Sequence, residues 1–199
     1  MDLKCGTSDV VGARIGVYPM QVDFVDVILN AVRATDRSGL AVMTDDLGTT
    51  IQGKRDRVFS YVKEVFLRAA DAGEHVVANV LFSVGCPGDV PEDFDFNVVV
   101  PKASLPIEDM QVACAWSLYP LGNKGYFDVI VEEVQKAINI SNLDVASYHY
   151  CTRLDGKAKD IFDLLEASFE GVSKRISHTI IHATLSKGSP SESKKNIVL

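Results

Sequence analysis

The stretch HVVANVLFSVGCP, residues 75–87, lies over HTIIHATLSKGSP, residues 178–190, when the chain is compared with itself. The offset between the two stretches is 103 residues (178 − 75). The same offset joins identical residues in other segments, which are Thr49 and Thr152, Gly53 and Gly156, Phe59 and Phe162, and Phe66 and Phe169. Identical residues at one spacing in several segments indicate two copies of one structural unit. We therefore predict a first repeat over residues 1–88, a linker over 89–111, and a second repeat with a frayed tail over 112–199.

Each copy shows the same order of predicted elements. A run that ends in proline predicts the first strand, and apolar residues at helical spacing predict the helix that follows it. A short hairpin comes next, over 40–53 in the first copy and 144–156 in the second. A second helix and the quoted final strand complete the copy. The order β-α-β-β-α-β, found twice, predicts an α+β fold of tandem ferredoxin-like repeats, with antiparallel sheets that carry helices on one face.

Composition and charge exclude several classes of protein. The chain has 199 residues, of which 47% are hydrophobic and 24% charged, and this balance is typical of a globular protein rather than a disordered one. No apolar run is long enough for a membrane span. The net charge of −7 without a basic stripe argues against a nucleic-acid partner. The first residues contain no signal-like apolar region, and the four cysteines form no CxxC pair, so we expect a cytoplasmic protein without a metal.

The final strand of each repeat separates into two faces because side chains alternate along a strand. In the first copy, one face is apolar and the other carries Asn79; in the second copy, His182 takes the equivalent position. The apolar faces are predicted to meet the core, and they comprise Val76, Ala78, Val80, Phe82 and Val84, then Thr179, Ile181, Ala183 and Leu185. The semi-polar faces suit a domain interface, a dimer interface or a small-molecule cleft.

Several polar and aromatic residues recur near these strands. Thr49 and Thr152 are kept in both hairpins, where they either pack as ordinary β-branched residues or offer a hydroxyl to a ligand. Asp45 of the first hairpin corresponds to Tyr148 of the second. Tyr18 and Tyr119 each precede a proline, and either pack as half-buried aromatic residues or stack on a heterocycle. For Asn79 and His182 the alternatives to a ligand are a bond within the protein and an interface contact.

No familiar motif of phosphate binding, metal binding or nucleophilic catalysis occurs in the chain. The four histidines are spread along the sequence and predict no metal site. The residues therefore indicate a site without an evident reaction.

The motifs resemble those of the YkoF family of thiamin/hydroxymethylpyrimidine-binding proteins. They are CGTS at 5–8, YPM at 18–20, TDDLGTTIQG at 44–53, HVVANVLFSVGCPGD at 75–89 and YPL at 119–121. The resemblance covers nearly the whole chain. It implies a non-enzymatic protein of tandem ferredoxin-like, ACT-like halves that forms a homodimer, binds thiamin or its hydroxymethylpyrimidine moiety without a cofactor, and serves salvage or uptake.

Carried over to this chain, the resemblance favours Thr49 and Thr152 as ligand-binding residues. Asp45, Asn79, Tyr148 and His182 follow from face and position, and Tyr18 and Tyr119 are candidates to cover a flat ring. An aminopyrimidine presents a donor beside an acceptor, which an amide or a strand's backbone N–H and C=O can satisfy. We expect it on the helix-free faces of the sheets. The alternatives are an ACT-type regulatory sensor of an amino acid and a small ferredoxin-like enzyme such as a cofactor-free monooxygenase.

Overall fold

Both halves of the chain have the element order predicted from the sequence. The computed structural model describes residues 10–85, 95–98, 100, 105–140 and 142–191. The first half contains β1 (Val11–Pro19), α1 (Phe24–Ala34), β2 (Leu40–Thr44), β3 (Thr49–Gly53), α2 (Arg55–Ala72) and β4 (Val76–Val84). The second contains β5 (Gln111–Leu121), α3 (Tyr126–Ile138), β6 (Leu143–Tyr148), β7 (Cys151–Lys157), α4 (Ala158–Ser173) and β8 (His178–Lys187). A 3-10 helix, η1 (Pro106–Asp109), precedes β5. The prediction of a tandem α+β fold is confirmed.

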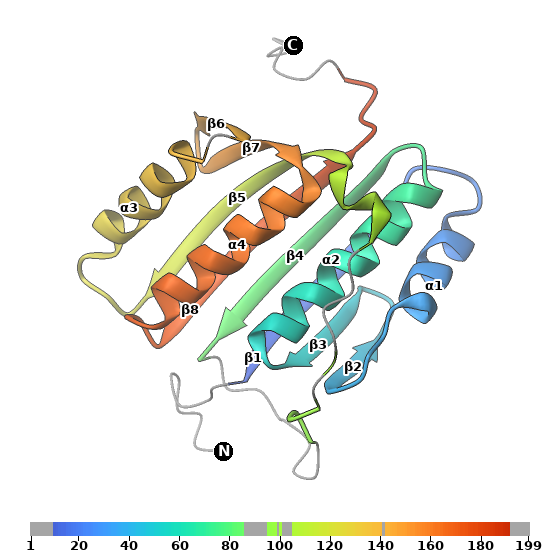
Figure 1. Cartoon of the computed structure of the whole chain (residues 1–199), viewed down its shortest axis with the longest axis horizontal. Helices are drawn as coiled ribbons and strands as arrows, with labels where there is room; N and C mark the ends of the chain where they lie inside the picture. Colours follow the sequence, from blue (N-terminus) through green and yellow to red (C-terminus); the bar gives the residue numbers. More distant parts are fainter. Residues whose placement is uncertain (1–9, 86–94, 99, 101–104, 141, 192–199) are drawn as a thin grey trace.

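The strands of both halves form one eight-stranded sheet in the order β2-β3-β1-β4-β8-β5-β7-β6. Every strand pair is antiparallel. The two halves join because β4 and β8 pair from Val76 opposite Lys187 to Val84 opposite Thr179. Each would otherwise be an edge strand with unpaired backbone groups. The sequence analysis describes a sheet for each repeat, whereas the structure has a single sheet with all four helices on one face (Figure 1).

Glycines at equivalent positions close the two ends of this join. Gly85 follows β4 with a φ of 79°, and Gly188 follows β8 with a φ of 71°. A Cβ at Gly85 would overlap the carbonyl oxygen of Ser177, and one at Gly188 would overlap that of Glu74. Only glycine adopts this conformation readily and leaves room for such a close approach. These residues therefore let β4 and β8 pair to their ends.

The core lies between the sheet and the helices, and both halves contribute to it. Along β4, Val76, Ala78, Val80 and Phe82 are buried while Asn79 and Leu81 are exposed, so the predicted core face is confirmed for these four residues. At the end of the strand the alternation is lost, because Val84 is only partly buried and Ser83 of the opposite face is buried. Phenylalanines of α2 and α4 meet in the centre: Phe59 contacts Phe169 with ring centroids 5.4 Å apart, and Phe66 contacts Phe162 at 6.3 Å. Phe59 also stacks on Phe82 at 4.0 Å. The four helical phenylalanines are the residues repeated at the 103-residue offset.

Among the helices that the structure describes, none combines the length and the apolar character that a bilayer crossing requires.

Candidate functional site

A pocket of about 740 Å³ lies in the second half of the molecule, between α3, the end of β5 and the tip of the β6–β7 hairpin. Its size falls in the range of small-molecule sites, which is roughly 300–1,000 Å³. Trp116 to Leu121 of β5 form one side, and the first turns of α3 form the opposite side. Further lining residues come from around the hairpin turn, and they are Ser147, Tyr148, Tyr150, Cys151 and Thr152. We refer to this cavity as the second-half pocket.

The second-half pocket follows a part of β5 that β7 does not cover. β7 pairs with β5 only from Gln111 to Trp116, although β5 continues to Leu121. An uncovered strand edge presents backbone N–H and C=O groups in a regular row. The hairpin turn is held beside this edge because the Ser117 hydroxyl donates a hydrogen bond to the Tyr150 carbonyl oxygen at 3.2 Å. Tyr150 has a φ of 74°, a left-handed conformation that a non-glycine residue adopts at a cost of about 1–2 kcal/mol.

The wall formed by α3 is apolar and largely uncovered. Phe127 is 65% exposed and Val131 is 50% exposed, and both line the second-half pocket. The far end of α3 is fixed instead, since Ala137 is buried and the Glu133 carboxylate is almost completely buried. Glu133 accepts hydrogen bonds from Lys136 at 2.7 Å and from Arg175 at 3.3 Å. The helix is therefore anchored at its C-terminal end and offers exposed apolar side chains to a ligand at its N-terminal end.

Two polar groups inside the second-half pocket have no partner among the described residues. Thr152 is opposite Trp116 in the β5–β7 register, and both are buried. The Thr152 hydroxyl makes no hydrogen bond within the described chain, and the buried indole N–H of Trp116 is also without a partner there. Leaving a buried donor unbonded costs about 1–3 kcal/mol. The Trp116 indole nitrogen has almost no accessible surface, so the Thr152 hydroxyl is the one of the two groups that a ligand can reach.

The structure brings three of the eight predicted ligand-binding residues together: Tyr119, Tyr148 and Thr152 all line the second-half pocket. Thr49, the first-half counterpart of Thr152, is buried, and its hydroxyl forms a hydrogen bond with the Thr44 hydroxyl at 3.0 Å. The two repeated threonines therefore differ, because only the Thr152 hydroxyl is free of a protein partner in the described part of the chain.

Asp45 is engaged in its own turn. Its carboxylate accepts hydrogen bonds from the Arg14 guanidinium at 2.6 and 2.9 Å, and from the backbone N–H groups of Leu47 and Gly48. The Arg14 side chain, followed by the Leu47 N–H, lowers the pKa of Asp45 below its ordinary value. This carboxylate stabilises the β2–β3 turn, and its predicted contact with a ligand stays a prediction.

The remaining candidates lie on the helix-free face of the sheet. Asn79 accepts a hydrogen bond from the Thr184 hydroxyl at 2.7 Å. His182 is opposite Leu81 on β4 and Ser117 on β5, and Tyr18 is 47% exposed. None of the three lines the second-half pocket. The sequence analysis expects the ligand on this open face, and that stays a prediction. Thr152 shares the helix side with Trp116, whereas Tyr119 alternates with the buried Leu118 along β5, so the second-half pocket takes lining residues from both faces of the sheet.

Sequence reasoning did not single out Trp116, Phe127 or the uncovered edge of β5. A signal for Trp116 exists, since it is the one tryptophan of the chain. Ile15 takes the equivalent position opposite Thr49 in the first half. Phe127 belongs to a run of apolar residues at helical spacing, and that pattern does not distinguish a core contact from a pocket wall.

One cysteine, Cys151, lines the second-half pocket. Cys114 and Cys151 are free thiols, and burial raises the pKa of Cys114 well above its usual range. Cys5 and Cys86 lie outside the described residues. The described part of the chain contains no cluster of three or more His, Cys, Asp or Glu side chains placed to hold a metal ion.

The fold and the pocket define a tandem ferredoxin-like protein with a cavity suited to a small molecule. The YKOF-related Family matches this sequence over residues 10–89 and 111–192. The chain belongs to that family.

A curated relative from Bacillus subtilis (strain 168), named "Putative HMP/thiamine-binding protein YkoF", is 34% identical over 202 residues. The alignment covers 98% of each chain. Among solved structures, Protein SP2199 from Streptococcus pneumoniae shows 14% identity and a TM-score of 0.35, covering 42% of this chain and 90% of its own. Clostridium acetobutylicum aspartate kinase shows 11% identity and a TM-score of 0.22, covering 83% of this chain and 33% of its own. These two structural likenesses are too weak to define the fold.

Proposed function

We propose that this protein binds thiamin or its hydroxymethylpyrimidine moiety without catalysing a reaction, and that the second-half pocket is a binding site. The observation that carries the proposal is the 740 Å³ cavity between an uncovered strand edge and an apolar helix wall. The name of the relative that aligns with 98% of the chain supports the same class of ligand. We further propose that the protein acts in vitamin salvage or uptake in the cytoplasm.

The chemistry of the second-half pocket suits a flat heterocycle. An aminopyrimidine has an exocyclic N–H beside a ring nitrogen, and a strand edge offers a carbonyl acceptor and an N–H donor at matching positions. The Thr152 hydroxyl provides a further polar group. Tyr119, Tyr148 and Phe127 can cover the faces of the ring, since aromatic side chains combine a large apolar area with defined geometry.

The lining of the second-half pocket favours binding over acid–base catalysis. The described residues around it include no carboxylate, imidazole or ammonium group. General acid–base chemistry most often uses such groups within hydrogen-bond reach of the reacting atoms, and the titratable groups that do line the pocket are the Cys151 thiol and tyrosine hydroxyls. A protein that only holds a ligand needs convergent polar groups on a rigid sheet, and the β5 edge with Thr152 supplies these.

A second site in the first repeat and a homodimer are also part of the proposal. Thr49, Asp45 and Asn79 are the candidates for the first-repeat site. The helix-free face carries half-exposed Tyr18 and Leu81, and such groups suit a contact between two copies of the chain. Calorimetry with thiamin would give the number of sites per chain, and sedimentation would give the number of chains.

The single tryptophan gives a selective test of the second-half pocket, because Trp116 lies in its wall. We expect thiamin, hydroxymethylpyrimidine or both to change its fluorescence in a saturable way. Bound ligand should also raise the unfolding temperature, and ligand at a hundred times Kd stabilises by about 2.7 kcal/mol. Amino acids in the same panel test the regulatory-sensor alternative. Absence of both effects for both vitamers at millimolar concentration would refute the proposal.

A further inference from the structure

A second cavity, of about 370 Å³, lies in the first half between the end of α1, β2 and α2. Its polar lining comes mainly from Arg33, Arg37 and Tyr61, with Thr35 and Thr44 beside them. The apolar part consists of two valines, Val32 and Val42. The cavity shares no lining residue with the second-half pocket. We call it the arginine cavity.

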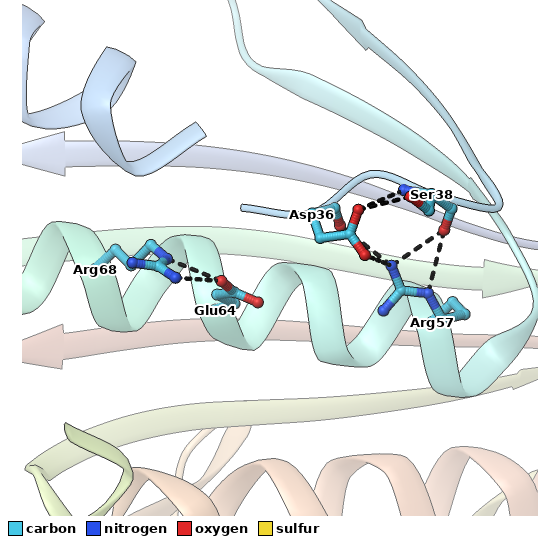
Figure 2. Close-up of polar contacts among 5 residues, drawn as sticks. All are labelled: Asp36, Ser38, Arg57, Glu64 and Arg68. Atoms are coloured by element: carbon cyan, nitrogen blue, oxygen red, sulfur yellow. Dashed lines mark hydrogen bonds and ion pairs between the residues drawn. The ribbon is translucent and has the colours of Figure 1, made fainter. Parts of the chain in front are cut away.

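Arg33 and Arg37 are exposed residues, and their guanidinium groups have no counter-charge among the described residues. Within the part of the chain that the structure describes, the side chains of Arg33 and Arg37 form no ion pair and no hydrogen bond, and no carboxylate lines the cavity. The carboxylates of this region are engaged elsewhere, as Figure 2 shows. Asp36 accepts hydrogen bonds from Ser38 at 2.7 and 3.0 Å and faces Arg57, and Glu64 forms an ion pair with Arg68 at 2.6 Å.

Arg57 is itself occupied, since it donates to the backbone carbonyls of Asp36 and Ser38 at 3.1 Å each. It holds the loop that carries Arg37 against the start of α2 (Figure 2). The backbone that carries Arg37 is therefore held beside the cavity by hydrogen bonds of Arg57, and the Arg37 guanidinium takes no part in them.

Tyr61 adds a third free donor to the arginine cavity. The residue is 1% exposed, and its hydroxyl has no hydrogen-bond partner among the described residues. Burial raises the pKa of Tyr61, so the hydroxyl stays protonated at neutral pH and can donate. The threonine hydroxyls beside it are already used, because Thr35 donates to the Ala31 carbonyl at 2.8 Å and Thr44 bonds Thr49.

A helix C-terminus favours one nearby cation through its partial negative charge, and this accounts in part for Arg33 in the last turn of α1. It does not account for Arg37, which lies beyond the helix. Arg33 also makes no hydrogen bond to the last carbonyls of α1 within the described residues. The partial charge at the end of α1 therefore explains one of the two arginines, and it does not explain why the second arginine and Tyr61 line the same cavity.

The second half lacks the same donor set. At the 103-residue offset, Arg37 corresponds to Ile140 and Tyr61 to Leu164. Arg33 corresponds to Lys136, whose ammonium group is paired with Glu132 at 2.8 Å and Glu133 at 2.7 Å. The repeated fold can therefore be built without these donors, so folding alone does not require them in the first half.

We propose that the arginine cavity binds a phosphate group, either as inorganic phosphate or as a phosphate monoester. Planar guanidinium groups match phosphate oxygens with two parallel N–H donors each, and the Tyr61 hydroxyl supplies another donor. The volume of about 370 Å³ leaves room for a small organic substituent beside the phosphate. This site uses a different cavity and a different ligand chemistry from the proposed vitamin site and does not rest on it.

The test measures binding of inorganic phosphate and of phenyl phosphate to the full chain by calorimetry and by thermal unfolding, against sodium chloride at equal ionic strength. We expect saturable binding by the natural protein. The double variant Arg33→Gln/Arg37→Gln should bind at least about tenfold more weakly, since hydrogen bonds to charged groups contribute about 1.5–3 kcal/mol each. Tyr61→Phe should weaken binding at least about tenfold, because the hydroxyl would donate to an anionic phosphate and hydrogen bonds to charged groups contribute about 1.5–3 kcal/mol.

Lys159→Gln is the matched control, because it removes one positive charge from an exposed position on α4 outside the cavity. It should bind phosphate like the natural protein. Circular dichroism and the unfolding temperature in chloride establish that each variant is folded. Tighter binding of phenyl phosphate identifies a monoester site, and tighter binding of inorganic phosphate identifies a free-phosphate site. Equal phosphate affinity in the double variant and the natural protein, or no phosphate effect beyond that of chloride, would overturn the proposal.

Thiamin binding at the second-half pocket can be measured on the same variants. The thiamin-dependent fluorescence of Trp116 should be unchanged in the double variant, because Arg33 and Arg37 do not line the second-half pocket. Failure of phosphate binding and failure of thiamin binding are therefore separate results.

Discussion

Replacing Phe127 by alanine should weaken ligand binding far more than it weakens the fold. The Phe127 side chain is 65% exposed and lines the second-half pocket. Full burial of a phenylalanine is favourable by about 1.5–3 kcal/mol. If a ligand covers the exposed two-thirds, the variant loses about 1–2 kcal/mol of binding free energy, or roughly 5- to 30-fold in Kd. The part already buried contributes only about 0.5–1 kcal/mol to the free energy of unfolding.

The assay is titration of Trp116 fluorescence with thiamin and with hydroxymethylpyrimidine, combined with urea unfolding of the same preparations. Phe24→Ala is the matched control, because Phe24 is the equivalent residue of α1 in the first repeat, is 49% exposed and does not line the second-half pocket. The control should leave the fluorescence titration unchanged. Unaltered affinity in the Phe127 variant, or a loss of unfolding free energy that matches the loss in binding, would refute the assignment of α3 as the pocket wall.

Three further predictions concern single interactions. Thr152→Val should weaken vitamin binding about two- to tenfold in the fluorescence titration, whereas Thr49→Val should leave that signal unchanged, because the Thr49 hydroxyl already bonds Thr44. Lys63→Met should lower the free energy of unfolding, measured in urea, by about 3–5 kcal/mol. The reason is that it leaves the mostly buried Glu108 carboxylate, 3.2 Å from the Lys63 ammonium, without its cation. Adding Glu108→Gln should recover most of this loss. Two cationic partners lower the pKa of Glu132 from 4.5 to about 2. The stabilising effect of this carboxylate is therefore present above pH 4.5 and disappears as the pH falls towards 2. Between pH 5 and 3, the unfolding temperature of the Glu132→Gln variant should fall less than that of the natural protein.

Much of the fold could be predicted because its signals are local. The period-two pattern of Val76 to Phe82 separated the buried face of β4 from the face with Asn79, and the structure has the same two faces. The candidate site was less predictable. Thr152, Tyr148 and Tyr119 line one pocket, but Asn79 and His182 do not line it. The sequence did not show that Thr152 pairs with Trp116, a register that depends on where β7 begins, and the open-face ligand stays a prediction.

By itself, the sequence determined the duplication, the order of elements and the residues that turn towards the core, because periodicity and internal identity are properties of neighbouring or equally spaced residues. Only the tertiary structure decided that β4 and β8 join two sheets into one, since strand edges pair through backbone groups that every sequence has. It also decided that β7 stops short of the end of β5 and that α3 leaves Phe127 uncovered there. A cavity is a place that side chains do not fill, and this depends on how whole elements lie relative to one another.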